Sequence, residues 1–127
     1  MKRFATIVAA VLAGGPLSAA ETDAGALLER GTYLMRHVAA CGNCHTPMGP
    51  DGPLPGQEMA GRFVLSVPGF DAYAPNLTPA AIGDWSDAEL ARAIREGIRP
   101  DGSVMGPPMA FPLYRAISDD DIAAIIA

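Results

Sequence analysis

The residues with the clearest chemical meaning in this sequence form one short motif, Cys41-Gly42-Asn43-Cys44-His45. Its spacing, C-x-x-C-H, is typical of covalent attachment of a c-type haem. Two thiols three positions apart can reach the two vinyl groups on one side of the porphyrin, and the next side chain then offers its imidazole to the iron. The motif therefore predicts one covalently attached haem c, held by Cys41 and Cys44, with His45 as the proximal iron ligand.

Three other interpretations of the two cysteines fit less well. A disulfide across a two-residue gap would close too small a loop to stabilise the chain much. A thioredoxin-like C-x-x-C follows a strand and opens a helix, whereas this motif follows a helical pattern and opens a segment rich in Gly and Pro. A zinc site would need two further ligands, and the sequence has no other Cys and only His37 left over.

The second axial position of the iron has several candidates, which are His37 and the methionines. Met35 belongs to the apolar face of a predicted helix and is most simply a core residue. Met48 is too close to His45 in the chain to cross the haem plane, and Met59 lies in a predicted loop. Two methionines nearer the C-terminus remain.

These two, Met105 and Met109, lie between the last two predicted helices, where a loop could cover the open face of a haem. Met109 follows Pro107-Pro108, whose fixed φ angles should hold the backbone extended. It also precedes Phe111 and Tyr114, which could shield an iron–sulfur bond from water. The greater rigidity favours Met109 as the sixth ligand. Met105, a histidine and an open position remain as alternatives.

Helical and irregular patterns flank the motif. Apolar residues recur at helical spacing from Ala24 to Val38, with Thr22 or Asp23 as the expected N-cap. From Thr46 to Pro79, 34 residues contain 5 Gly and 7 Pro, so we expect a long irregular loop. No run with period-2 alternation predicts a strand.

Two shorter helices are predicted by their capping residues. Ser86 and Glu89 form the capping-box pattern, and Gly97 can end that helix in a left-handed conformation. Another helix begins after Ser118 and stops at Ala127, with three acidic residues in its first turn, where the helix dipole favours them. The predicted fold is a small, loop-rich all-α domain.

Residues 1–20 have the pattern of a secretory signal peptide. Lys2 and Arg3 precede an apolar run, and Ser18-Ala19-Ala20 has the small residues of a cleavage site. The apolar run is about half the length that a bilayer span needs. We therefore expect cleavage after Ala20, a single domain over residues 21–127 without a membrane span, and a periplasmic location.

Charge and composition limit the partners and the core. Removing the signal peptide with its Lys2 and Arg3 changes the formal net charge from −5 to −7 and leaves no lysine, which argues against nucleic acid as a partner. The 127 residues include 14 Gly and 12 Pro, well above the ordinary share of about 12%. A small chain so rich in helix breakers is expected to rely on a cofactor for part of its core.

Together these residues resemble the class I, mitochondrial-type c cytochromes, and more narrowly one haem domain of the cytochrome c subunits of bacterial alcohol, gluconate and aldehyde dehydrogenases. The resemblance covers nearly all of the chain after residue 20. The matching stretches are Arg30-Gly31-x-Tyr33-Leu34, Cys41-Gly-Asn-Cys-His-Thr-Pro47, Tyr73-Ala-Pro-Asn-Leu-Thr-Pro79, Ile82-Gly-Asp-Trp-Ser86, Arg95-Glu-Gly-x-Arg-Pro-Asp-Gly102, Pro108-Met109-x-Phe111 and Ser118-Asp119-x-Asp121.

The resemblance implies a small cytochrome c fold around one haem, attached through the two cysteines, with His45 as the proximal and Met109 as the distal ligand. It also implies that residues 73–85 lie near the haem edge, where Asn76 or Trp85 could hydrogen-bond a propionate. The dehydrogenase subunits usually carry three haem domains and a membrane anchor, whereas this sequence has one haem motif and no anchor. The last predicted helix also stops early, at Ala127, so we expect either thin packing against the first helix or a sequence that is incomplete at its end.

The function expected from these features is that of a periplasmic monohaem electron carrier. It would take single electrons from a dehydrogenase and pass them to a terminal oxidase or another cytochrome. A fixed electron-transfer subunit of an oxidoreductase complex and a haem-based gas or ligand sensor are the alternatives. The sequence contains neither a Ser/His/Asp set nor a phosphate-binding glycine loop that would suggest catalysis by the chain itself. We therefore do not expect an enzyme.

Overall fold

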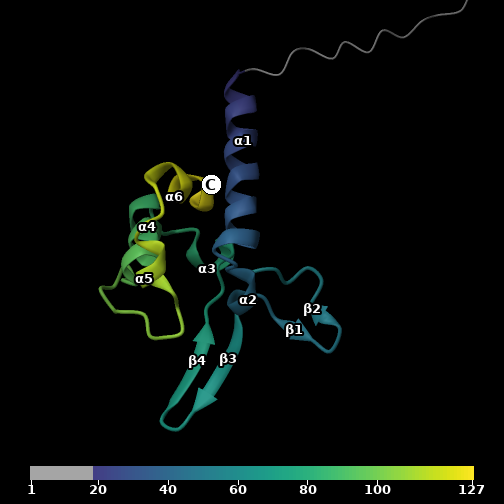
Figure 1. The fold of residues 1–127 in the computed structure, drawn as a ribbon, viewed down its shortest axis with the longest axis vertical. Coiled ribbons are helices and arrows are strands. Elements are labelled where there is room, and N and C mark those ends of the chain that lie inside the picture. Colours follow the sequence, from purple (N-terminus) through teal and green to yellow (C-terminus); the bar gives the residue numbers. More distant parts are fainter. Residues whose placement is uncertain (1–18) are drawn as a thin grey trace, which may run out of the picture.

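The computed structural model describes residues 19–127. The predicted signal peptide, residues 1–20, therefore lies almost entirely outside the described residues. Figure 1 shows the elements in chain order: α1 (Ala19–Tyr33), the π-helix η1 (Leu34–Val38), α2 (Gly42–His45), β1 (Met48–Gly49), β2 (Gly52–Pro53), β3 (Arg62–Val67), β4 (Phe70–Ala74), α3 (Pro79–Ile82), α4 (Asp87–Glu96), α5 (Phe111–Tyr114) and α6 (Asp119–Ile126).

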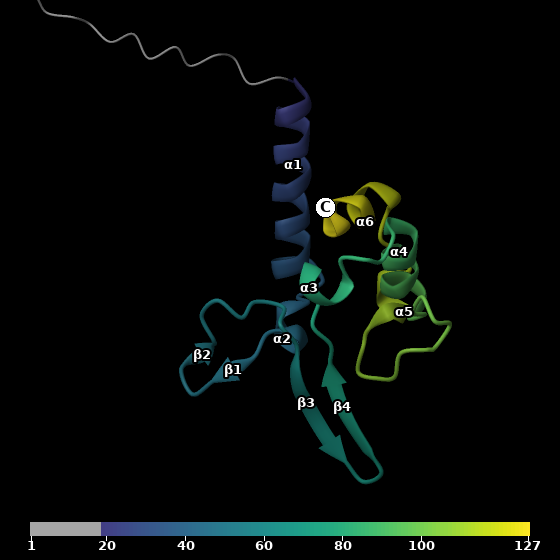
Figure 2. The same cartoon turned by 180° about the vertical axis from the view of Figure 1, so that it is seen from behind.

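The helices form two groups that face each other. The long α1 runs along one side and leads through η1 into α2, while α4, α5 and α6 gather on the other side (Figure 1). The view from behind shows the same two groups, with the β3–β4 hairpin projecting beyond α2 (Figure 2). Among residues 19–127, no helix has the length and hydropathy that a membrane crossing requires.

The prediction that the fold is all-α is wrong between residues 46 and 79. Strands β3 and β4 pair antiparallel there, with Phe63 opposite Tyr73, and β1 and β2 form a second, very short hairpin. The rings of Phe63 and Tyr73 meet edge-to-face with centroids 5.3 Å apart. Pro68-Gly69 supplies the turn, and Gly69 has a φ of +84°. A strand is predicted from alternating apolar and polar residues. That alternation is missing here, because the register shifts after Phe63 and both faces of the strand are exposed.

The first helix lies where it was predicted and, counted together with η1, ends at Val38 as predicted, but its start and the form of its last turn differ. It begins at Ala19, so Thr22 and Asp23 lie within the helix and do not cap it. At the other end the last turn widens into the π-helix η1, in which the backbone N–H of Ala39 donates to the carbonyl of Leu34 at 2.8 Å. This wider turn leads the chain directly into the C-x-x-C-H motif.

The predicted caps of the two later helices are confirmed. Ser86 Oγ accepts from the backbone N–H of Glu89, whose carboxylate accepts from the backbone N–H of Ser86 at 2.8 Å. Gly97 ends α4 with a φ of +69°, in the left-handed region. Ser118 Oγ caps α6 by accepting from the N–H of Asp121 at 3.2 Å.

The expectation of thin packing between the first and last helices is wrong. Gly31 lets α1 approach the backbone of α6 so closely that a Cβ on it would lie 2.6 Å from the carbonyl carbon of Ala124. Beside this contact, Arg30 donates to both carboxylate oxygens of Asp121, at 2.9 and 3.1 Å. Ile122 and Ala124 are buried in the same interface. The close approach compensates for the small number of turns in α6.

The close contact at Gly31 predicts that the effect of a glycine-to-alanine substitution on stability depends strongly on its position in α1. Gly31→Ala should push the two helices apart and lower the free energy of unfolding by about 2 kcal/mol, as overpacking typically does. Gly25→Ala, in the same helix with nothing within 4 Å of its Cβ, should be neutral or stabilise by about 0.5–1 kcal/mol. Denaturant titrations measure both variants, and equal stability of the two would contradict the contact.

Candidate haem site

The C-x-x-C-H motif forms a single helical turn. The backbone N–H groups of Cys44 and His45 both donate to the carbonyl of Cys41, at 3.2 and 3.0 Å. The two thiols are half-buried and are not joined in a disulfide. Burial raises the pKa of the Cys41 thiol, with a smaller contribution from the neighbouring Cys44. The turn therefore presents two thiols and an imidazole from one short segment.

His45 is buried, with 6% of its surface exposed, and its imidazole is oriented by one hydrogen bond. Its Nδ1 lies 2.8 Å from the carbonyl oxygen of Pro75. Because a carbonyl oxygen only accepts, Nδ1 carries the proton and the neutral ring keeps the lone pair of Nε2 for a metal. Burial lowers the pKa of His45, which favours this neutral form. The arrangement leaves Nε2 of His45 free to bind a metal.

The base of the β3–β4 hairpin holds His45 from two directions. Gly61, just before β3, donates its N–H to the backbone carbonyl of His45 at 2.7 Å, and Pro75, just after β4, accepts from the ring. Gly61 has a φ of +82°, and a Cβ on it would lie 2.7 Å from the backbone nitrogen of Asn76. Sequence reasoning missed Gly61 because only the pairing of the two strands brings it to the motif.

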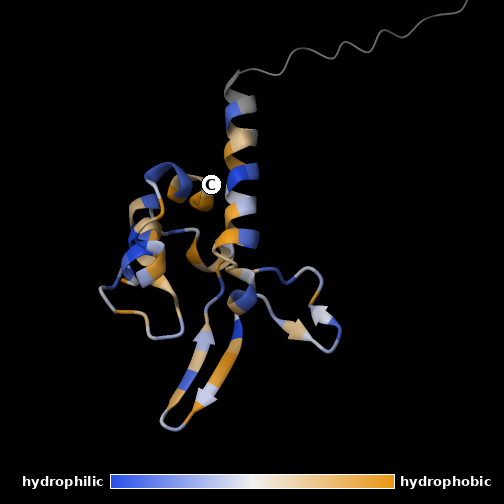
Figure 3. Ribbon diagram, viewed as in Figure 1, coloured by the Kyte–Doolittle hydropathy of each residue, from blue (hydrophilic) through white to orange (hydrophobic). Residues whose placement is uncertain are grey.

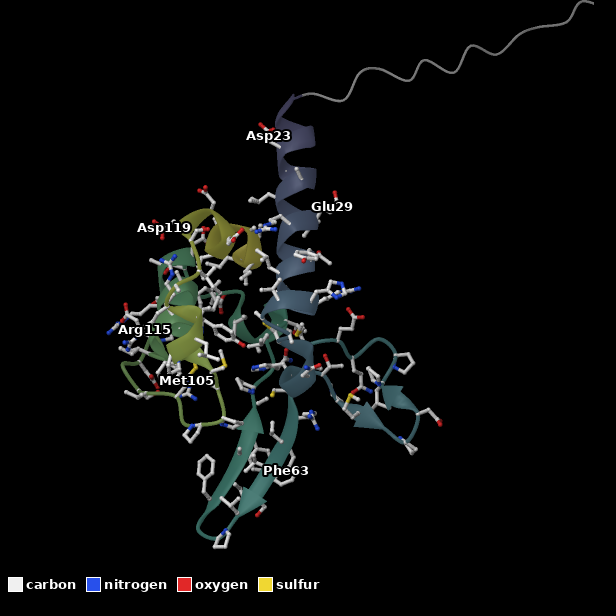
Figure 4. The ribbon with its side chains drawn as sticks, in the orientation of Figure 1. Asp23, Glu29, Phe63, Met105, Arg115 and Asp119 are labelled. Atoms are coloured by element: carbon white, nitrogen blue, oxygen red, sulfur yellow. The ribbon has the colours of Figure 1, made fainter. Side chains whose placement is uncertain are left out.

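The segment that contains the two candidate methionines lies on the other side of the molecule, next to α5, where Figure 4 shows Met105. Met105 is held through its backbone, whose N–H donates to the carbonyl of Gly97 at 2.7 Å. Pro107-Pro108 lies in a turn, so the predicted extended backbone before Met109 is wrong. Both methionines are half-buried.

Tyr114, at the end of α5, links this segment to the haem-attachment turn. Its hydroxyl donates to the carbonyl of Ala39 at 2.9 Å, two residues before Cys41. Burial raises the pKa of Tyr114, and the nearby thiols of Cys41 and Cys44 add to the effect. The segment that follows Met109 therefore lies close to the C-x-x-C-H turn, although it is far from it in the sequence.

The remaining candidate ligands lie elsewhere. His37 is exposed on η1, and the centroid of its ring lies 5.6 Å from that of Tyr33. Met48 is half exposed on β1. Met35 and Met59 line the same cleft beside α6.

The two residues suggested for a propionate lie after β4. The side-chain oxygen of Asn76 accepts from the backbone N–H of Thr78 at 2.7 Å, which leaves the amide nitrogen of Asn76 for other partners. Trp85 is half-buried just before the cap of α4.

The described part of the chain contains few large buried side chains. The buried apolar residues are Leu34, Ala72, Ala93, Ile122 and Ala124, and none of the large side chains in the described part of the chain is fully buried. Figure 3 shows apolar stretches in the lower turns of α1, in β3 and in α6. Two thiols on one turn and an oriented neutral imidazole together fit a c-type haem.

Known proteins with similar sequences include cytochrome c subunits of dehydrogenases. The chain is 32% identical over 130 residues to the gluconate 2-dehydrogenase cytochrome c subunit of Pantoea cypripedii, with 100% of this chain and 28% of the relative covered. It is 37% identical over 105 residues to the alcohol dehydrogenase (quinone) cytochrome c subunit of Gluconobacter oxydans, covering 80% of this chain and 20% of that subunit.

A further relative is a diheme cytochrome c-type protein of Cereibacter sphaeroides, 34% identical over 121 residues that cover 92% of this chain and 39% of the relative. The chain spans only about a quarter of the length of the dehydrogenase subunits named above. No protein-family model matches it. The similarity nevertheless extends along nearly the whole chain. The chain is a cytochrome c domain that resembles part of the cytochrome c subunits of gluconate, alcohol and fructose dehydrogenases.

Proposed function

We propose that this domain carries one haem c and transfers single electrons from a dehydrogenase to a downstream acceptor. The observation that carries the proposal is the buried imidazole of His45, which donates through Nδ1 to Pro75 from within the C-x-x-C-H turn. Cys41 and Cys44 would form the two thioether bonds, and His45 would be the proximal ligand. The bound haem supplies the one-electron chemistry of its iron.

The roles of the chain's own residues in this function follow from their positions. The hydrogen bond to Pro75 holds the ring of His45 in one orientation and increases the basicity of Nε2. The burial of His45 keeps water away from its ring, which favours a stable ligand set. We propose that the domain transfers electrons without catalysing a reaction itself.

We propose Met109 as the sixth ligand. Met109 directly precedes the segment that contains Tyr114. The hydroxyl of Tyr114 donates a hydrogen bond to the carbonyl of Ala39, beside the haem-attachment turn. Met105 remains the alternative, because the bond from its N–H to Gly97 gives its own backbone a defined position. An open sixth position would instead fit a gas or ligand sensor.

The proposed location is the periplasm, after removal of residues 1–20, and the proposed partner is a dehydrogenase. The names of the relatives support a fixed subunit of a dehydrogenase complex, while a diffusible carrier is the second possibility. The formal net charge of −7 without the signal peptide favours a basic docking patch on the partner. Co-purification of a dehydrogenase at high salt supports a subunit, and isolation of the domain alone supports a carrier.

The assignment of Met109 predicts a specific spectroscopic loss. The near-infrared band of methionine–iron ligation in the ferric protein should be present in the wild type and absent from Met109→Ala. Met105→Ala is the matched control and should keep the band. The opposite pattern would move the assignment to Met105, and a wild type without the band would favour the sensor.

The sparse core predicts that folding depends on haem attachment. Cys41→Ala/Cys44→Ala, which lacks both attachment points, should lose most of its helical circular dichroism and its cooperative unfolding transition, because binding to the folded state supplies stability. Gly25→Ala, produced in the same haem-attaching host, is the control that should keep both. Native helix content in the double variant without haem would argue against a haem-dependent core.

A further inference from the structure

Arg62, the first residue of β3, lies directly beside the haem-attachment turn. Its Nη2 donates to the backbone carbonyl of Asn43 at 2.7 Å, and Asn43 is the residue between the two cysteines that precedes Cys44. The preceding residue, Gly61, is bonded to the backbone carbonyl of His45. Across the hairpin, Arg62 pairs with Ala74, the neighbour of Pro75. The guanidinium is therefore held on the same backbone segment that presents His45.

The charge of Arg62 has no partner of opposite sign in the described part of the chain. The ion pairs between residues 19 and 127 involve Arg30, Arg36, Arg92 and Arg95, whose carboxylates lie 2.7 to 3.5 Å away. The Nε of Arg62 is buried and has no hydrogen-bond partner. The Nε of Arg95 is also buried and unpartnered, but Arg95 pairs with Asp119.

A buried guanidinium nitrogen without a hydrogen-bond partner, on an arginine without an ion pair, calls for an explanation. A structural role alone would be served as well by a neutral donor to the Asn43 carbonyl. A cation that no carboxylate neutralises instead acts on every charge nearby, and it acts most strongly where water is excluded. The charge that changes in an electron-transfer domain is that of the redox centre.

We propose that Arg62 is a positioning residue that holds the Cys41–His45 turn through Asn43 and, by its positive charge, raises the reduction potential of the haem. The inference rests on the proposed function, since it requires a haem on this turn. Reduction adds one electron to the iron, and a nearby cation stabilises the more negative, reduced state relative to the oxidised state. Loss of the charge should therefore make the domain harder to reduce.

The test compares three variants of the haem-loaded protein. Arg62→Gln keeps a side-chain donor but removes the charge, Arg62→Lys keeps the charge but not the planar guanidinium, and Arg92→Gln removes an exposed arginine of α4 whose pair with Glu96 spans one helical turn. Potentiometric titration with ferricyanide and dithionite gives the potential of each. Absorption spectra report haem attachment and axial ligation, and thermal melts report stability.

The expected result separates charge from structure. Arg62→Gln should shift the equilibrium with a one-electron donor about tenfold toward the oxidised domain, which equals about 59 mV lower potential. Arg62→Lys should recover most of this shift, and Arg92→Gln should change the potential little. Equal potentials for wild type and Arg62→Gln, with attachment and ligation intact, would overturn the proposal.

Other outcomes are equally decisive. If Arg62→Gln and Arg62→Lys lower the potential alike, the charge is not responsible and the proposal fails. Failure of both to attach haem, while Arg92→Gln attaches it, would show that Arg62 serves only folding and would also overturn the proposal. A wild type without covalent haem would instead refute the proposed function itself, so the two failures are distinguishable.

Discussion

Beyond its own helical turn, His45 is held by two hydrogen bonds, one at its backbone carbonyl and one at its imidazole, which come from the residues that flank the β3–β4 hairpin. The bond to the ring sets the tautomer, so Nε2 keeps its lone pair. The bond from Gly61 to the backbone keeps the last residue of the turn next to β3. Gly61 directly precedes β3 and Pro75 directly follows β4, so the pairing of the two strands places both partners beside His45.

The two groups of helices add the second constraint. Gly31 lets α6 lie against α1, and the Arg30–Asp121 pair lies at the edge of this contact. On the same side of the molecule, Tyr114 reaches from α5 to the carbonyl of Ala39. These contacts bring the segment after Met109 close to the C-x-x-C-H turn. A core with few large buried side chains thus gains order from close backbone contacts and from bonds between distant segments.

Local signals in the sequence predicted local structure well. The capping residues Ser86 and Ser118 and the left-handed Gly97 act within a few residues of the helices that they cap. Their effect can therefore be predicted without knowledge of the fold. The β3–β4 hairpin was missed because its strands show no alternating burial and include a register shift. The packing of α6 was underestimated, because the length of a helix does not reveal how closely a glycine lets its partner approach.

The sequence by itself determined the chemical groups: two thiols and an imidazole at the spacing of haem attachment, and a chain in need of a cofactor for its core. The five residues of the C-x-x-C-H motif are consecutive, so their spacing is the same whatever the arrangement of the other residues. Only the tertiary structure decided which partners those groups have. The carbonyl of Pro75 and the guanidinium of Arg62 lie 30 and 19 residues from their partners in the motif, at the base of the paired strands β3 and β4. Such pairing depends on contacts distant in sequence, which no local pattern encodes.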